Sequence, residues 1–235
     1  MTPRTRLGAR TGLAWRNIYD DPVDWAGSHR DAQVLVRWVA ERLIHPDPGL
    51  GRDGPVCPFV RQATKRRALW AAMVPGGDDL TTAAMTAAVD DAIDLHRALR
   101  DAEPENRLLA TLTLFPGLTR HQLVDTVHLA RKTGVVEQGL MLGQFYPGCA
   151  VSGLWNRDFH PLDAPVPMLV IRRMMNTDFP FLAARTEWLY SYLSHVAPDL
   201  PRNLRHAIAD RLRVDEIAAG GITELRVHSP GEHAR

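Results

Sequence analysis

Two residues able to bind a metal or attack an electrophile lie in one proline-rich stretch of this sequence. His45 and Cys57 stand near the two ends of residues 45–60, which contain four prolines and three glycines. Proline lacks the backbone N–H and fixes φ, so the stretch is predicted to be an irregular loop rather than a helix or a central strand. Rigid loops on a folded scaffold often carry ligand and cofactor contacts. The loop therefore holds the first candidate site residues.

Each of these side chains has a structural interpretation beside the chemical one. His45 follows an expected helix, so it either caps the helix C-terminus or offers its imidazole to a metal or a heme iron. Cys57 has no base beside it in the sequence. It is a small buried apolar residue, a thiolate ligand or a nucleophile. The residue types alone leave these alternatives open.

A second irregular segment, residues 145–156, combines aromatic residues with turn formers. Phe145, Trp155 and Asn156 belong to it, and His160 follows shortly afterwards. The segment either covers the core or forms the wall of a pocket. His96, in contrast, lies in an acidic stretch whose i, i+3 and i, i+4 spacing favours an ion-paired helix face, or a carboxylate that pairs with a substrate amine.

Arg172 and Arg173 end an apolar run that reads as a strand. Consecutive strand residues face opposite sides of a sheet, so one of the two is expected to point inward. A buried guanidinium needs an anion. The anion is a protein carboxylate, a heme propionate or the carboxylate of a substrate.

The elements that must position these residues alternate between helices and short apolar strands. Helices are predicted over 28–44, from 81 or 82 to about 100, from the Thr119–Gln122 capping box to Gly134, and over 178–196 and 202–219. Strands are predicted over 68–74, 107–115, 139–146 and 166–172. The pattern predicts an α/β or α+β fold with a single mixed sheet of about four strands flanked by helices. Residues 1–27 and 222–235 are expected to be tails, and 28–221 a single globular domain.

Composition excludes several classes of function. The chain has 235 residues and a net charge of +1, so nothing in its overall charge favours nucleic acid or an anionic membrane. No apolar run reaches the roughly 18 residues of a membrane span, no signal-peptide core follows Met1, and a cytoplasmic protein is expected. The two cysteines, Cys57 and Cys149, lie far apart without zinc-ligand spacing. The motifs of common hydrolases, NTPases, Rossmann oxidoreductases and zincins are absent from the sequence.

Several segments together resemble a known group of sequences. Gly54–Val60 (GPVCPFV), Gly139–Cys149 (GLMLGQFYPGC), Gly153–Leu162 (GLWNRDFHPL) and Pro165–Met174 (PVPMLVIRRM) resemble an actinobacterial family of single-domain proteins of unknown function. The layout is also distantly similar to the YqcI/YcgG-type proteins, which include heme-dependent oxygenases that hydroxylate side-chain nitrogens of amino acids. Cys57 and Phe59 match the Pro-Cys loop of that group, and Asn156, Phe159 and Leu162 match a later block. Tyr146-Pro147 stands where that group has His-Pro.

The second resemblance implies a heme-dependent oxygenase of a small amine or amino acid in a biosynthetic pathway. In that hypothesis His45 is the axial iron ligand, with His96, His160 and Cys57 as alternatives. Heme would be bound by His45, Cys57, Phe59, Phe145, Trp155, Asn156, Arg172 and Arg173. The implied partners are a small-molecule substrate and an electron donor.

Two other classes of function remain open from the sequence. One is a non-catalytic protein that binds a small molecule or a partner, and the other is a cofactor-free enzyme with Cys57 as its nucleophile. The late aromatic residues Trp188, Tyr190 and Tyr192 are compatible with a homodimer, although such residues more often belong to a core.

Overall fold

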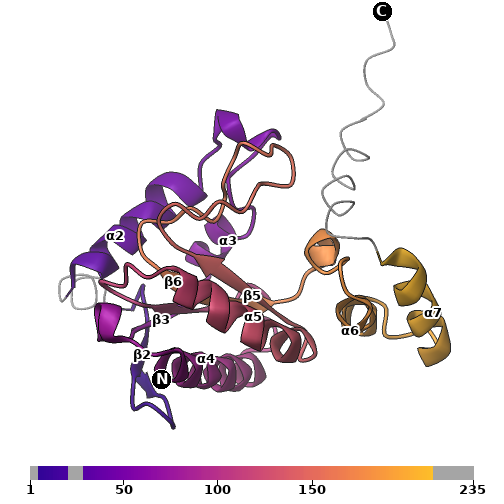
Figure 1. The fold of residues 1–235 in the computed structure, drawn as a ribbon, viewed down its shortest axis with the longest axis horizontal. Helices are drawn as coiled ribbons and strands as arrows, with labels where there is room; N and C mark the ends of the chain where they lie inside the picture. The colour runs from indigo at the N-terminus through magenta and orange to yellow at the C-terminus, as the bar shows by residue number, and fades with distance from the viewer. Residues whose placement is uncertain (1–4, 21–28, 214–235) are drawn as a thin grey trace, which may run out of the picture.

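The protein is built on one mixed sheet of six strands with helices on both faces (Figure 1). The computed structural model describes residues 5–20 and 29–213. The strands run in the order β1-β2-β3-β4-β6-β5. Their bounds are Thr5–Leu7, Ala14–Asn17, Leu69–Met73, Ala110–Leu114, Leu140–Phe145 and Met168–Arg173 for β1 to β6. The predicted α/β class with a single mixed sheet is confirmed.

The centre of the sheet is the parallel pair β3 and β4. A parallel pair needs a crossover, and here α4 (Thr82–Ala102) supplies it. The remaining pairs, β1–β2, β2–β3, β4–β6 and β6–β5, are antiparallel. Every residue of β4 is buried, as in a central strand covered on both faces, although its sequence alternates with Thr111 and Thr113.

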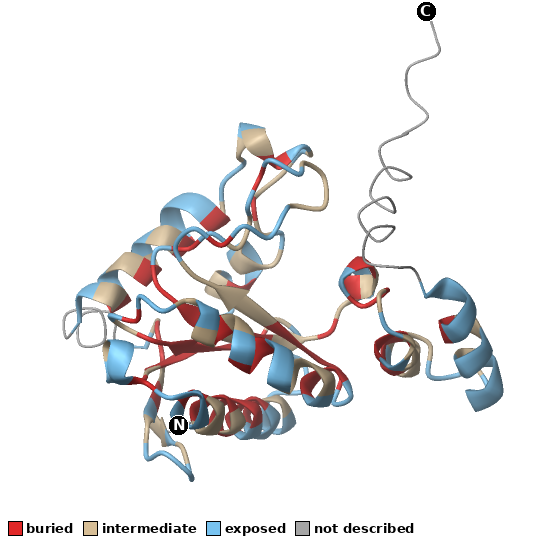
Figure 2. Ribbon diagram, viewed as in Figure 1, coloured by how far each residue is buried: buried red, intermediate tan, exposed pale blue. Residues whose placement is uncertain are grey.

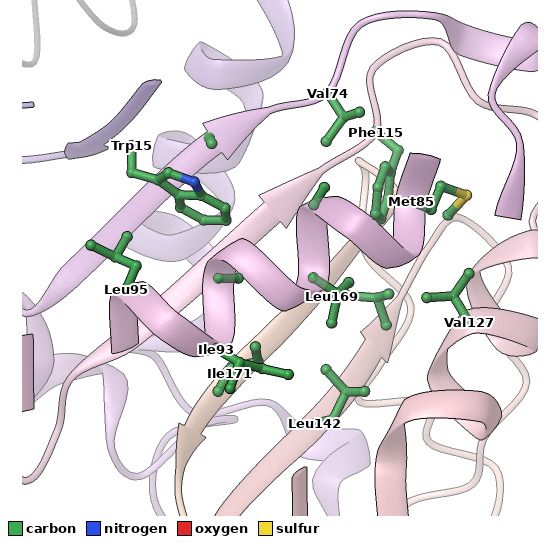
Figure 3. Close-up of a cluster of buried hydrophobic side chains, with 14 of the residues drawn as sticks. Trp15, Val74, Met85, Ile93, Leu95, Phe115, Val127, Leu142, Leu169 and Ile171 are labelled. Carbon is green, nitrogen blue, oxygen red and sulfur yellow. The ribbon is translucent and has the colours of Figure 1, made fainter. Parts of the chain in front are cut away.

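One face of the sheet is covered by α4 and α5 (Gln122–Val136). Their apolar stripes bury one side of β3, β5 and β6 in the larger core cluster, which Figure 3 shows in part. Thr81 caps α4 by accepting a hydrogen bond from the backbone N–H of Ala84. Phe115, which directly follows β4, is fully buried in this layer.

The opposite face is covered by shorter elements from the first half of the chain. They are α2 (Arg30–Trp38), the π-helical turn η1 (Val39–Leu43), the 3-10 turn η2 (Pro48–Leu50) and α3 (Val60–Lys65). Leu35 and Val39 of this layer are buried with Leu112 and Met168 of the sheet. The sheet therefore separates two apolar cores, and the proline-rich loop belongs to the second.

The last elements lie beside the β5 edge rather than over a face. After β6 come η4 (Asn176–Phe181), α6 (Thr186–Val196) and α7 (Arg202–Leu212), with the short turn η3 (Gly77–Asp79) earlier in the chain. Trp188 and Tyr192 of α6 pack against Val136 and Met141. Figure 2 shows α7 mostly exposed, and Ala209 is its one buried residue.

The structure corrects several sequence predictions. Residues 5–17 were expected to be part of a tail, but they form the hairpin β1–β2 that extends the sheet from four strands to six. The hairpin turn is held by the buried Asp91 of α4, which accepts hydrogen bonds from the backbone N–H groups of Arg10 (3.0 Å) and Thr11 (2.9 Å). Because these strands are three and four residues long, no apolar alternation marks them in the sequence.

Other differences concern element ends. The Thr119–Gln122 capping box does not form, because the Thr119 hydroxyl donates to Asp78 and the N-cap of α5 is His121. Helix α5 passes through Gly134, and the left-handed residue that follows it is Gly139. The first part of the predicted helix 178–196 is the turn η4. The predicted tail 222–235 and the end of the predicted helix 202–219 lie outside the described residues. In the part of the chain that is described, no helix has the length and apolarity of a membrane span.

Candidate functional site

The proline-rich loop is irregular, as predicted, and it closes on itself. Pro46 and Pro55 form an antiparallel bridge, and the N–H of Val56 donates to the carbonyl of His45 at 2.9 Å. The N–H of Cys57 donates to the carbonyl of Leu43 at 3.0 Å, which ties the loop to the end of η1. These bonds fix the direction in which the chain leaves the loop toward Phe59.

The second irregular segment packs on this loop. The Asn156 amide donates to the carbonyl of Gly49 at 2.8 Å. Gly51 has a φ of +77° and lies so close to the Trp155 carbonyl that an added Cβ would stand 2.7 Å from its oxygen. Asn156 and Trp155 thus meet the loop, and their contacts hold the two segments together.

Arg172 points to the second core layer, and its anion is a protein carboxylate. Its two guanidinium NH₂ groups donate to the two oxygens of Asp178, both at 2.7 Å. Asp178 is buried and also accepts from the N–H of Met175. The same guanidinium lies 5.5 Å from the centre of the Phe59 ring. Arg172 therefore links the end of the proline-rich loop to the turn after β6.

Phe145 lies on the same side of the sheet. Alternation along β6 puts Met168, Val170 and Arg172 on one face, and the register pairs Phe145 with Met168. The Phe145 ring meets the edge of Trp38 at 6.2 Å between ring centres. Figure 2 shows the end of β5 as half-buried.

Six half-buried residues on this side of the sheet are grouped here as the aromatic face. They pack against, or lie beside, the second core cluster and come from α2, the loop before α3, and strands β5 and β6. Each of these residues is only partly buried, so part of its surface is accessible to solvent. The aromatic face consists of Trp38, Cys57, Phe59, Phe145, Val170 and Arg172.

The four residues considered as iron ligands occupy different environments. His45 and His160 are exposed. His96 is buried in α4, on the opposite side of the sheet, where burial lowers its pKa to about 4. Of the four, Cys57 is the one on the aromatic face. Arg173 follows Arg172 in β6, and by alternation it lies on the other face of the sheet.

A further polar cluster was not singled out from the sequence. The Tyr146 hydroxyl donates to the Asp125 carboxylate at 2.8 Å, and the His121 ring stacks on the Tyr146 ring with 5.1 Å between centres. Burial, with contributions from Asp125 and Cys149, raises the pKa of the Tyr146 phenol. His121 and Asp125 are four residues apart at the start of α5, and Tyr146 directly follows β5. The contact of Tyr146 with His121 and Asp125 depends on how β5 packs against α5, which the sequence does not show. Only the i, i+4 spacing of His121 and Asp125 was visible in the sequence.

The structure also contains an open pocket of about 510 Å³ between the turn after α5 and helices α6 and α7. None of the residues predicted for the site lines it. In the ranges 5–20 and 29–213, no group of three or more His, Cys, Asp or Glu side chains is placed to hold a metal ion. The pocket lining is Glu137, Thr186, Glu187, Tyr190, Ser191, Ser194, His195 and His206.

Comparison with known proteins gives one result. Residues 32–207 match a family described as a domain of unknown function, DUF6875. No curated protein and no solved structure matches the chain. The matched range includes the proline-rich loop, every strand from β3 onward and most of α7. Since the match spans more than half of the sequence, this chain belongs to the DUF6875 family.

Proposed function

We propose that this chain binds heme at the aromatic face and oxidises a small amine or amino acid there. The observation that carries the proposal is that Cys57, Phe59, Phe145 and Arg172 are all half-buried on one side of the sheet, where Arg172 lies over the Phe59 ring. These residues come from three segments, and the outermost of them, Cys57 and Arg172, are 115 positions apart in the sequence. The similarity of the Pro-Cys loop to YqcI/YcgG-type proteins supports the choice of heme among apolar ligands.

The chemistry of the donor set fits a porphyrin. Cys57 offers a half-buried thiol, and a thiolate is an established axial ligand of heme iron. Trp38, Phe59 and Phe145 offer apolar ring surface, which matches the macrocycle. Cys57 is proposed as the ligand in preference to His45, because His45 is exposed and outside this surface. Axial ligation by His45 stays a prediction, and the absorption spectra described below test it.

The roles of the chain's own residues follow from their contacts. A bound heme would supply the activation of oxygen. Asp178 holds Arg172, and Arg172 holds the Phe59 ring, so this wall of the site is fixed before any ligand arrives. The rings of Trp38 and Phe145 pack edge to face. They would form a second apolar wall of the site and exclude water from it.

The test is an absorption spectrum of the purified protein before and after titration with hemin. The proposal predicts a Soret band with saturable hemin uptake at one equivalent, and His45→Ala is expected to leave that band in place. Loss of the band in His45→Ala would restore His45 as the ligand. A colourless protein that takes up no hemin would overturn the proposal.

A second candidate function rests on the partial exposure of the Cys57 thiol, which a cofactor-free nucleophile also requires. It predicts rapid alkylation of Cys57 by iodoacetamide near neutral pH in protein that binds no hemin. Slow alkylation of colourless protein would exclude this function and favour a non-catalytic binding protein.

A further inference from the structure

The open pocket beside α6 is a cavity that the proposed heme site does not use. Its volume of about 510 Å³ falls in the range of small-molecule sites and is far larger than a single ion or water molecule fills. The residue after α5, one side of α6 and one residue of α7 form it. Figure 1 shows α6 and α7 beyond the β5 edge of the sheet, away from α2 and α3. The pocket is therefore separate from the aromatic face.

The charge on the pocket wall comes from carboxylates. Among the described residues that line it are Glu137 and Glu187, and none of them is a lysine or an arginine. Glu137 directly follows α5 and is exposed, and within residues 5–20 and 29–213 its carboxylate makes no ion pair or hydrogen bond. Glu187 is paired only at 3.6 Å, with the exposed Arg185. One free and one loosely held carboxylate thus line a space whose wall has no permanent cation.

A buried hydroxyl in the same wall lacks a partner. Ser191 lines the pocket and is only 8% exposed, yet its hydroxyl makes no hydrogen bond to the described part of the chain. Its backbone carbonyl is already engaged, because it accepts from Nδ1–H of His195 at 2.7 Å. The nearby Ser194, in contrast, donates its hydroxyl to the Tyr190 carbonyl at 2.8 Å. A buried polar group without a partner is costly, and the pocket is the space from which a partner for Ser191 can come.

Contacts among its own residues hold the wall in shape. The Tyr190 ring stacks on the His206 ring with 3.9 Å between centres, which joins α6 to α7. The His195 ring packs against Gly139, where an added Cβ would stand 2.2 Å from it. Arg205 lies outside the lining, 5.8 Å from the centre of the Tyr190 ring, and donates to two backbone carbonyls of the turn before α7. The pocket is therefore formed before a ligand binds.

We propose that this pocket binds a small aliphatic amine in its ammonium form. An ammonium group supplies what the wall lacks: a positive charge for Glu137 and Glu187, and N–H donors for the Ser191 hydroxyl oxygen. An organic cation fits better than a metal ion, because in the described ranges no group of three or more His, Cys, Asp or Glu side chains is placed to hold a metal. The volume leaves room for the hydrocarbon part of the amine. Binding here requires no heme, so colourless protein is suitable for the test.

The test titrates the full wild-type chain, labelled with nitrogen-15 and free of hemin, with n-butylammonium chloride at pH 7 and follows the backbone amide chemical shifts. Sodium chloride added in equal amounts to a reference sample accounts for ionic strength. Saturable shifts are expected at the amides of the lining, Glu137 and Ser191 among them. Butyrate and 1-butanol, which have the same chain length, are expected to cause much smaller shifts, and tetramethylammonium, which has no N–H donor, to bind several-fold more weakly. No saturable shift with butylammonium, or equal binding of any of the three other compounds, would overturn the proposal.

Matched glutamate variants test whether the pocket, rather than the surface charge of the protein, attracts the amine. Glu137→Gln removes one charge at an exposed position and is expected to weaken butylammonium binding several-fold. The control is Glu105→Gln, at an exposed position between α4 and β4 and outside the pocket lining, which is expected to leave the affinity unchanged. Wild-type affinity in Glu137→Gln would show that this carboxylate does not hold the amine. An equal loss in both variants would show that general surface charge causes the attraction, and either result would contradict the proposal.

Discussion

Arg172 and Asp178 form a two-pronged ion pair, with both N–O distances at 2.7 Å, between the end of β6 and the turn after it. The Asp178 side chain is 2% exposed and that of Arg172 29% exposed. The pair therefore sits where water competes weakly, and it fixes the guanidinium that lies over the Phe59 ring.

Replacing Asp178 by asparagine is expected to destabilise the protein by about 3 kcal/mol, because it leaves a half-buried guanidinium without its anion. Urea unfolding of wild type and variant measures the difference. The control is Asp101→Asn, which removes the exposed partner of Arg100 and is expected to change stability by at most about 1 kcal/mol. Equal effects of the two substitutions would show that the Asp178 pair is not a structural anchor.

Gly139→Ala tests how tightly the turn after α5 is packed. Gly139 has a φ of +72°, and an added Cβ would stand 2.2 Å from the His195 ring. The substitution combines left-handed backbone strain of about 1 kcal/mol with a steric clash. A double-mutant cycle separates the two, since His195→Ala is expected to remove the clash and leave the strain. Additive effects of the two substitutions on the free energy of unfolding would contradict the contact.

Two buried histidines predict the pH dependence of stability. Burial lowers the pKa values of His96 and His128 from 6.5 to about 4 in the folded protein. Between those values the unfolded chain binds more protons than the folded one, so stability is fully present above pH 6.5 and is lost as the pH falls toward 4. Each group contributes up to roughly 3 kcal/mol over this window.

Unfolding free energies measured between pH 7 and 4 check the sign and the size of this effect. His96→Leu is expected to reduce the slope of stability against pH, whereas His160→Gln, at an exposed position, is expected to leave it unchanged. Identical slopes for wild type and His96→Leu would mean that His96 titrates normally in the folded state.

The hairpin β1–β2 depends on one carboxylate. Asp91 also accepts from the Thr11 hydroxyl at 2.7 Å, in addition to the two backbone N–H groups of the turn. Asp91→Ala is expected to raise hydrogen exchange of the backbone amides in residues 5–17 while those of β4 stay protected. Unchanged protection of the hairpin in the variant would show that strand pairing with β3 alone holds it.

Local sequence patterns predicted the helices and strands in which most residues are buried. Strand β3 is an apolar run and β4 is an alternating, β-rich stretch, both followed by Pro-Gly, and α4 has both a cap and a long apolar stripe. Strands β1 and β2 were missed because they are short and carry Arg6 and Arg16. Their placement comes from pairing with β3 and from Asp91, which lies some eighty residues away along the chain. Tertiary pairing of this kind leaves no local signal.

The candidate site was predictable in composition but not in arrangement. Prolines identified the loop that carries Cys57 and Phe59, and the strand end identified one of Arg172 and Arg173 as a residue that needs an anion. Asp178 was not named as that anion, because the turn η4 that returns it to β6 was expected to be part of a helix. Likewise, the placement of Phe145 on the same side of the sheet as Phe59 follows from the order of β4, β6 and β5, which the sequence pattern does not specify.

The measurement closest to the central claim compares Cys57→Ser with Cys149→Ser after hemin titration. Both variants remove a thiol, but Cys57 is half-buried on the aromatic face, whereas Cys149 is buried and belongs to the Tyr146 cluster. The account predicts that Cys149→Ser keeps the wild-type Soret band, and that Cys57→Ser shifts or loses both this band and the red-shifted carbon monoxide spectrum typical of thiolate ligation. Unchanged hemin spectra in Cys57→Ser, or no hemin uptake by the wild type, would contradict it.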